Sequence, residues 1–198
     1  VLIYFFYDSE EPAQENAIKD EISSLVTSSS SVGLIDDKRI IEAESEPGNW
    51  IAHGRTYEEQ RFSPLTKINK ESVSDLGLAW YKDMKTNRAL EATPIVVDGI
   101  MFFTSTWSRV YAVEAKTGET LWFFDPEVPR EWARKACCDI VNRGVAVYKG
   151  KVFFASLDGR LFSLNAETGK KLWEVDTVID RSRAYTITGA PRVAKDKI

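Results

Sequence analysis

Residues 110–122 read VYAVEAKTGETLW and residues 161–173 read LFSLNAETGKKLW, two copies of one pattern that ends in a Thr-Gly pair and a closing tryptophan. Upstream of each copy, residues 95–103 (IVVDGIMFF) match residues 146–154 (AVYKGKVFF) at the same spacing of 51 residues. Hydrophobic runs that alternate with Asp-Gly, Lys-Gly and Thr-Gly pairs are typical of short strands joined by hairpin turns. The sequence therefore predicts an all-β chain made of a repeated unit.

A repeat of about 50 residues with about four strands is typical of a β-propeller, in which one blade cannot bury both faces of its sheet alone. We expect the closing tryptophans Trp80, Trp122 and Trp173 to be structural, because such a ring can pack against the turn of an adjacent blade. A third copy begins at residues 189–193 (GAPRV), and the sequence stops at Ile198. We therefore expect an amino-terminal fragment of about two to three blades, truncated in the third repeat.

Two regions are expected from the change in composition along the chain. Residues 34–198 are expected to form the propeller portion, and the acidic, Ser-rich residues 1–33 a flexible leader. Within the leader, the spacing of apolar positions would also allow a short helix over residues 13–26. The apolar residues 1–7 have three open interpretations: the remnant of an export signal, a buried strand, or a boundary left by cloning or gene modelling.

The overall composition excludes several classes of function. The chain has 198 residues, of which 43% are hydrophobic, and a net charge of -4, which predicts a globular core and no nucleic-acid partner. A single histidine, His53, and two cysteines do not supply the usual ligands of a zinc site.

The two cysteines, Cys137 and Cys138, are adjacent in the sequence. A disulfide between neighbours closes a strained ring, because consecutive Cα atoms lie only about 3.8 Å apart. The alternative is a pair of free thiols packed as small apolar residues. The cysteine pair alone leaves both interpretations open.

Seven motifs follow one another along the chain: NW at 49–50, HGRTY at 53–57, QRFSPL at 60–65, LGLAW at 76–80, LEATP at 90–94, CCDIVNRG at 137–144 and YTITGAP at 185–191. In this order and spacing they closely resemble the pyrroloquinoline quinone (PQQ) dependent alcohol dehydrogenases, from about residue 34 to residue 198. The repeats resemble that family's tryptophan docking motif, with Glu114 and Asn165 where an Asp is usual. LEATP and the long Cys-Cys-Asp segment are most similar to the quinohaemoprotein branch.

The resemblance implies an eight-bladed propeller that holds PQQ and a calcium ion near its axis. It implies that Cys137 and Cys138 form a vicinal disulfide against one face of the quinone, and that Glu91 contacts the cofactor's edge. Arg143 would pair with PQQ carboxylates, a task that suits the planar, always charged guanidinium. Thr188 would donate its hydroxyl to the cofactor, with Thr186 as the competing choice. The resemblance assigns no cofactor role to Trp50, His53 or Asp139.

The implied reaction is oxidation of an alcohol to an aldehyde, by hydride transfer to PQQ with the help of calcium. The resemblance places the catalytic residues and the calcium ligands beyond residue 198. This fragment would therefore carry part of the PQQ-binding wall, hold no metal site and lack activity alone. The alternative is a non-catalytic propeller scaffold with the same repeat, which needs none of the predicted site residues. A third candidate, a sugar-oxidising quinoprotein, would lack the adjacent cysteines.

The resemblance also implies partners and a location. The expected partners are a small alcohol substrate and a cytochrome or quinone electron acceptor, and membrane association would arise only through partner subunits. A carboxy-terminal domain with haem c would lie outside this sequence. Because a strained disulfide needs an oxidising compartment, we expect an exported, periplasmic protein.

Overall fold

The computed structural model describes residues 2–3 and 32–198. The expected leader lies largely outside the described residues, and the helix expected at 13–26 lies wholly outside them. The strands are β1 (Leu2–Ile3), β2 (Trp80–Tyr81), β3 (Ile95–Val97), β4 (Ile100–Thr104), β5 (Val110–Glu114), β6 (Thr120–Phe124), β7 (Ala146–Tyr148), β8 (Lys151–Ala155), β9 (Arg160–Asn165) and β10 (Lys171–Asp176). Within residues 32–198 the structure has the α-helix α2 (Asp37–Ile41) and 3-10 turns at Ala43–Ser45, Val73–Asp75, Thr106–Ser108 and Arg130–Arg134. In the described part of the chain, no helix is long and apolar enough to cross a membrane.

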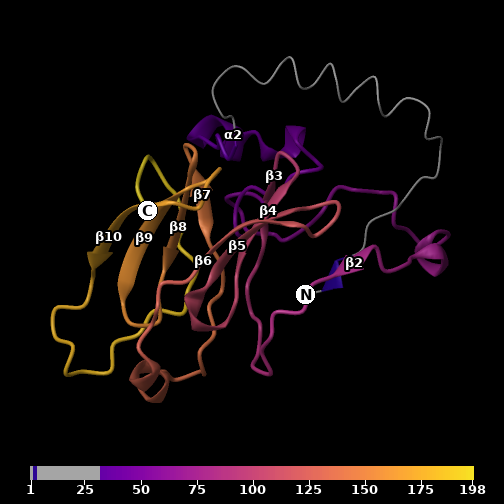
Figure 1. Ribbon diagram of the computed structural model, residues 1–198. Helices are drawn as coiled ribbons and strands as arrows, with labels where there is room; N and C mark the ends of the chain where they lie inside the picture. The colour runs from indigo at the N-terminus through magenta and orange to yellow at the C-terminus, as the bar shows by residue number, and fades with distance from the viewer. Residues whose placement is uncertain (1, 4–31) are drawn as a thin grey trace.

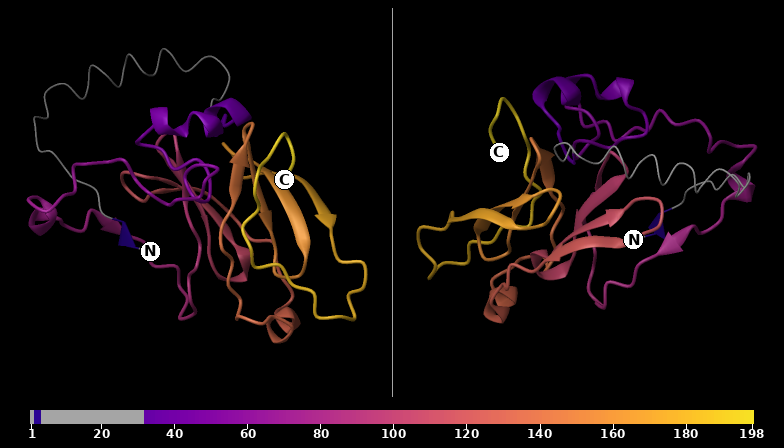
Figure 2. Two further views of the ribbon diagram at one scale, coloured as in Figure 1. Left: turned by 180° about the vertical axis from the view of Figure 1, so that it is seen from behind. Right: turned by 45° about the horizontal axis from the view of Figure 1, so that its top comes forward.

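The strands form two four-stranded antiparallel sheets, β3-β4-β5-β6 and β7-β8-β9-β10, which lie side by side in Figures 1 and 2. Their registers are equivalent, because Phe102 pairs with Ala112 in the first sheet and Phe153 pairs with Ser163 in the second. Each sheet is a meander of one repeat, and we call them the first and second blade. The prediction of an all-β propeller fragment is confirmed. The pair β1 and β2 forms a separate small sheet.

Two of the closing tryptophans join successive repeats. The indole Nε1 of Trp80 donates to the carbonyl of Ala115 at 3.1 Å, and that of Trp122 donates to the carbonyl of Ala166 at 2.9 Å. Each tryptophan thus contacts the turn of the repeat that follows it, which confirms the structural role predicted for these two. Trp173 lies in β10 with 40% of its surface exposed and its ring 5.9 Å from that of Phe153.

The main hydrophobic core lies between the two blades and the segment that precedes them. It contains Phe102 of the first blade, Phe154 of the second, and Ile35 and Ile40 around α2. Asp36 caps α2 by accepting a hydrogen bond from the Arg39 amide at 2.7 Å, which fixes where this helix begins. The segment around α2 covers one end of the two blades in Figure 2.

Two connections run from the last strand of one repeat to the first strand of the next, residues 82–94 before β3 and residues 125–145 before β7. A third connection comprises the residues that follow β10 up to about 190. All three lie at the end of the blades away from α2, on the lower side of Figure 1. This end is where a propeller brings loops from successive blades together, and it holds every predicted site residue.

Candidate functional site

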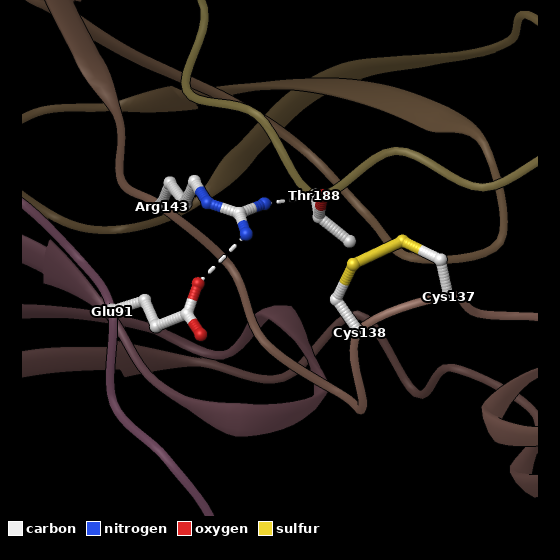
Figure 3. Close-up of a disulfide and its surroundings, with 5 residues drawn as sticks. All are labelled: Glu91, Cys137, Cys138, Arg143 and Thr188. Carbon is white, nitrogen blue, oxygen red and sulfur yellow. Dashed lines mark hydrogen bonds and ion pairs between the residues drawn. A yellow bond between two sulfur atoms is a disulfide. The ribbon is translucent and has the colours of Figure 1, made fainter.

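The structure brings the five predicted site residues together from three connections. Glu91 comes from the first connection, Cys137, Cys138 and Arg143 from the second, and Thr188 from the third, as Figure 3 shows. The hydrophobic repeats fix the first two connections, because these end where β3 and β7 begin.

Arg143 is the centre of the group. Its Nη2 forms an ion pair with Glu91 Oε2 at 2.8 Å, and its Nη1 donates to Thr188 Oγ1 at 2.6 Å. Backbone hydrogen bonds join the same three connections. The Arg143 amide donates to the Thr188 carbonyl at 3.0 Å, and the Thr93 amide donates to the Arg143 carbonyl at 3.1 Å. The Arg143 and Glu91 side chains keep 39% and 38% of their surface exposed, so both remain open to a ligand.

Cys137 and Cys138 form a disulfide, so the interpretation as two free thiols is wrong. Both cysteines are exposed, and Figure 3 shows the disulfide next to Thr188. The chain behind the disulfide is anchored, since Ile140 is 4% exposed and its carbonyl accepts a hydrogen bond from the Trp107 amide at 3.1 Å. The disulfide therefore presents an exposed, covalently rigid surface beside the arginine.

Gly144 allows the first strands of the two blades to approach closely. Its φ is +130°, and a Cβ at this position would lie 2.8 Å from the Thr93 carbonyl oxygen. Any other residue would push the second connection away from the first. Glycine is thus required directly after Arg143 for Glu91 and Arg143 to meet.

The two candidate threonines for cofactor contact, Thr186 and Thr188, have different surroundings. Thr188 contacts Arg143, whereas Thr186 lines a separate hollow within the third connection, together with Val178 and Tyr185. This arrangement supports Thr188 as the residue that belongs to the arginine group.

The residues of the amino-terminal segment lie elsewhere. Trp50 exchanges backbone hydrogen bonds with Val96 of β3, at 2.7 and 3.0 Å. His53 lines an apolar cavity of about 220 Å³ between this segment and β7, where burial and the charges of Arg192 and Arg61 lower its pKa. Among the described residues, no group of three or more His, Cys, Asp or Glu side chains could hold a metal ion.

Sequence reasoning missed two residues next to the site. Arg88 forms an ion pair with Asp139 at 3.3 Å and so ties the first connection to the residue after the disulfide. Asn142 is 2% exposed and bonds to residues of both blades. The 51-residue repeat could have drawn attention to Asn142, because this residue occupies the position of Glu91 in the next copy. No sequence signal marks Arg88.

Comparison with known proteins gives one consistent family. The model of the "Glucose/ethanol/alcohol dehydrogenase, beta-propeller domain", called PQQ, matches residues 50–190. The dehydrogenase subunit of the alcohol dehydrogenase (quinone) of Komagataeibacter europaeus is 52% identical over 164 residues, covering 80% of this chain and 22% of that protein. The quinohemoprotein alcohol dehydrogenase ADH-IIG of Pseudomonas putida is 54% identical over 164 residues, covering 83% of this chain and 23% of that protein.

Solved structures agree with these relatives. That of the Pseudomonas putida quinohemoprotein alcohol dehydrogenase superposes with a TM-score of 0.82 at 53% identity, over 84% of this chain and 24% of that one. A europium-containing methanol dehydrogenase gives a TM-score of 0.75 at 39% identity, over 81% of this chain and 28% of that one. The chain thus spans about a quarter of the length of the relatives it matches. Since the family model covers most of its length, this chain belongs to the glucose/ethanol/alcohol dehydrogenase family through its β-propeller domain.

Proposed function

We propose that residues 34–198 are the amino-terminal part of a PQQ-dependent alcohol dehydrogenase, and that the three connections around Arg143 form one wall of its cofactor site. One observation carries this proposal: Arg143, held between Glu91 and Thr188, lies beside an exposed vicinal disulfide. A structural scaffold has no need for a charged group and a disulfide at the same loop end of two blades.

The residues present fit a planar, anionic ligand such as PQQ. Arg143 has five N–H donors, and the contacts with Glu91 and Thr188 involve two of its three nitrogens. The Thr188 hydroxyl accepts a hydrogen bond from Arg143, so its own proton is free for an acceptor oxygen of the ligand. The disulfide adds an exposed apolar surface against which a flat ring can lie. Arg143 would hold a carboxylate, Glu91 and Thr188 would orient the ring's edge, and the disulfide would support its face.

When bound, PQQ would supply the hydride acceptor for alcohol oxidation, and the calcium ion that the resemblance implies would polarise the quinone. The residues of this chain bind and orient the cofactor. We infer that the catalytic base and the calcium ligands follow residue 198 and that the fragment has no activity alone. The whole enzyme would turn alcohols into aldehydes.

Partners and location follow from the same reasoning. Relatives are named as alcohol dehydrogenase (quinone) and as 1-butanol dehydrogenase (cytochrome c), which supports a quinone or cytochrome as electron acceptor. Relatives named quinohemoproteins support a haem c domain further along the full-length protein. A disulfide persists in an oxidising compartment, which supports the periplasm.

The test uses the full-length protein reconstituted with PQQ and calcium, and it measures alcohol-dependent dye reduction together with PQQ affinity. We expect turnover in the wild type and a loss of PQQ affinity of at least a hundredfold in Arg143→Ala, because a charged carboxylate partner is removed. Arg192→Ala is the matched control, since Arg192 forms an ion pair of similar exposure with Glu59. If the wild type neither binds PQQ nor oxidises alcohols, the propeller is a scaffold.

A further inference from the structure

We propose that Asn142 is a positioning residue that acts through Arg143: its buried side chain fixes the direction in which the guanidinium points. The inference rests on the proposed function only in naming PQQ as the ligand. It is argued from a buried amide, both of whose polar atoms are hydrogen-bonded, directly before an arginine whose side chain is 39% exposed.

The internal repeat shows what is unusual about Asn142. Glu91 lies three residues before Pro94 and Thr188 lies three residues before Pro191, while Asn142 follows Glu91 by the repeat length of 51. The three residues therefore occupy the same position in successive repeats. Glu91 and Thr188 turn to Arg143, whereas Asn142 is 2% exposed. In the second repeat, Asn142 is buried and the next residue, Arg143, lies in the site instead.

Asn142 bonds to both blades. Its Nδ2 donates to the carbonyl of Ala155 in β8 at 2.8 Å, and its Oδ1 accepts from the Gly144 amide at 3.1 Å. Its own carbonyl accepts from the Oγ1 of Thr104 in β4 at 3.2 Å. Thr104 is also 2% exposed, so none of these bonds competes with bulk water. A buried amide held on both sides has one orientation.

This orientation determines where Arg143 points. The backbone of Arg143 is hydrogen-bonded through both its groups, the amide to Thr188 and the carbonyl to Thr93, so a preceding amide fixed inside the second blade holds the direction of the arginine side chain. The Gly144 bond secures the chain on the far side of Arg143 as well. Loss of the amide would leave buried partners unsatisfied and would free the arginine to leave Glu91 and Thr188.

The test compares Asn142→Asp in the full-length protein with wild-type Arg143 and with Arg143→Ala. The carboxyl group keeps the shape of the amide but loses the Nδ2 donor that bonds the Ala155 carbonyl. We expect PQQ affinity to fall about tenfold with Arg143 present and by less than twofold with Arg143→Ala, because the effect passes through the arginine. Asn165→Asp is the control: that side chain accepts bonds from Glu167 and Thr168, so PQQ affinity should not change.

Two further measurements keep the proposal testable. If Asn142→Asp does not fold, Thr104→Val takes its place in the test. This substitution removes only the hydroxyl that bonds the Asn142 carbonyl, and it should weaken PQQ binding by two- to threefold. Amide hydrogen exchange needs no cofactor: Asn142→Asp should speed exchange at Thr93 and Arg143, whose amides bond within this junction, more than at core strand amides.

The outcomes separate the two proposals. Equal affinity losses in both arginine backgrounds, or a lowered unfolding temperature with unchanged affinity, would overturn the positioning role. If the wild type binds no PQQ, the proposed function fails, and exchange at Thr93 and Arg143 still decides whether Asn142 positions this junction. Unchanged exchange at both amides would refute the inference.

Discussion

The indole ring of Trp122 lies directly against Gly169, so closely that a Cβ on this glycine would be 2.6 Å from the ring. The same contact joins Trp80 to Gly118 in the preceding repeat, at 2.5 Å. Trp80 and Trp122 therefore each cover the turn of the next repeat and donate a hydrogen bond to it. In a protein built of blades, such contacts between neighbours carry much of the stability.

Gly169→Ala should be more destabilising than Gly99→Ala in the full-length protein. Both glycines have positive φ, +68° and +77°, so both substitutions incur a backbone strain of about 1–2 kcal/mol. A Cβ at Gly99 meets nothing within 4 Å, whereas at Gly169 it meets the Trp122 ring. We expect a further cost of about 1–3 kcal/mol from overpacking at Gly169. Urea unfolding of both variants checks this, and equal costs would show that the tryptophan contact adds nothing.

The 51-residue repeat made the two blades predictable from the sequence. Trp122 could be assigned as structural because its strand and turn recur 51 residues later, at Trp173, and the structure places Trp80 and Trp122 on the turns of the following repeats. The contact between Glu91 and Arg143 has no such period. It depends on the paths of two irregular connections and on the positive φ of Gly144. The site residues came from a resemblance to a family, and only the structure showed that three of them bond to one another.

Reduction of Cys137–Cys138 should weaken PQQ binding without lowering the stability of the fold. A disulfide stabilises by closing a loop of chain, and the loop between adjacent residues contains no further residues. We expect the unfolding temperature of the full-length protein to change by less than about 2 °C, because 1 kcal/mol moves that of a 150–250-residue domain by about 2–4 °C and that of a longer protein by less. PQQ affinity, measured by titration before and after dithiothreitol treatment, should fall at least tenfold. A large drop in unfolding temperature would contradict this prediction.

The charges next to the disulfide should control how fast it is reduced. Asp139 follows Cys138 directly, and Arg88 neutralises its carboxylate at 3.3 Å. Because the attacking form of dithiothreitol is an anion, Arg88→Gln should slow reduction and Asp139→Asn should speed it, each by about two- to fivefold. High salt should shrink both effects. Lys149→Gln is the control, since Lys149 pairs with Asp196 at the opposite end of the blades, where its amide bonds to the Ile35 carbonyl. Thiol titration over time gives the rates, and identical rates in all variants would refute the electrostatic explanation.

His53 should make the fold less stable in mild acid. Burial, followed by the charges of Arg192 and Arg61, lowers the pKa of His53 in the folded protein below its usual value of about 6.5. The unfolded chain then binds the proton more readily, so stability is complete above about pH 6.5 and falls as the pH drops below it. His53→Gln cannot titrate, so its unfolding temperature should fall less between pH 7 and pH 5 than that of the wild type. Two parallel curves would mean that burial does not penalise the charged imidazole.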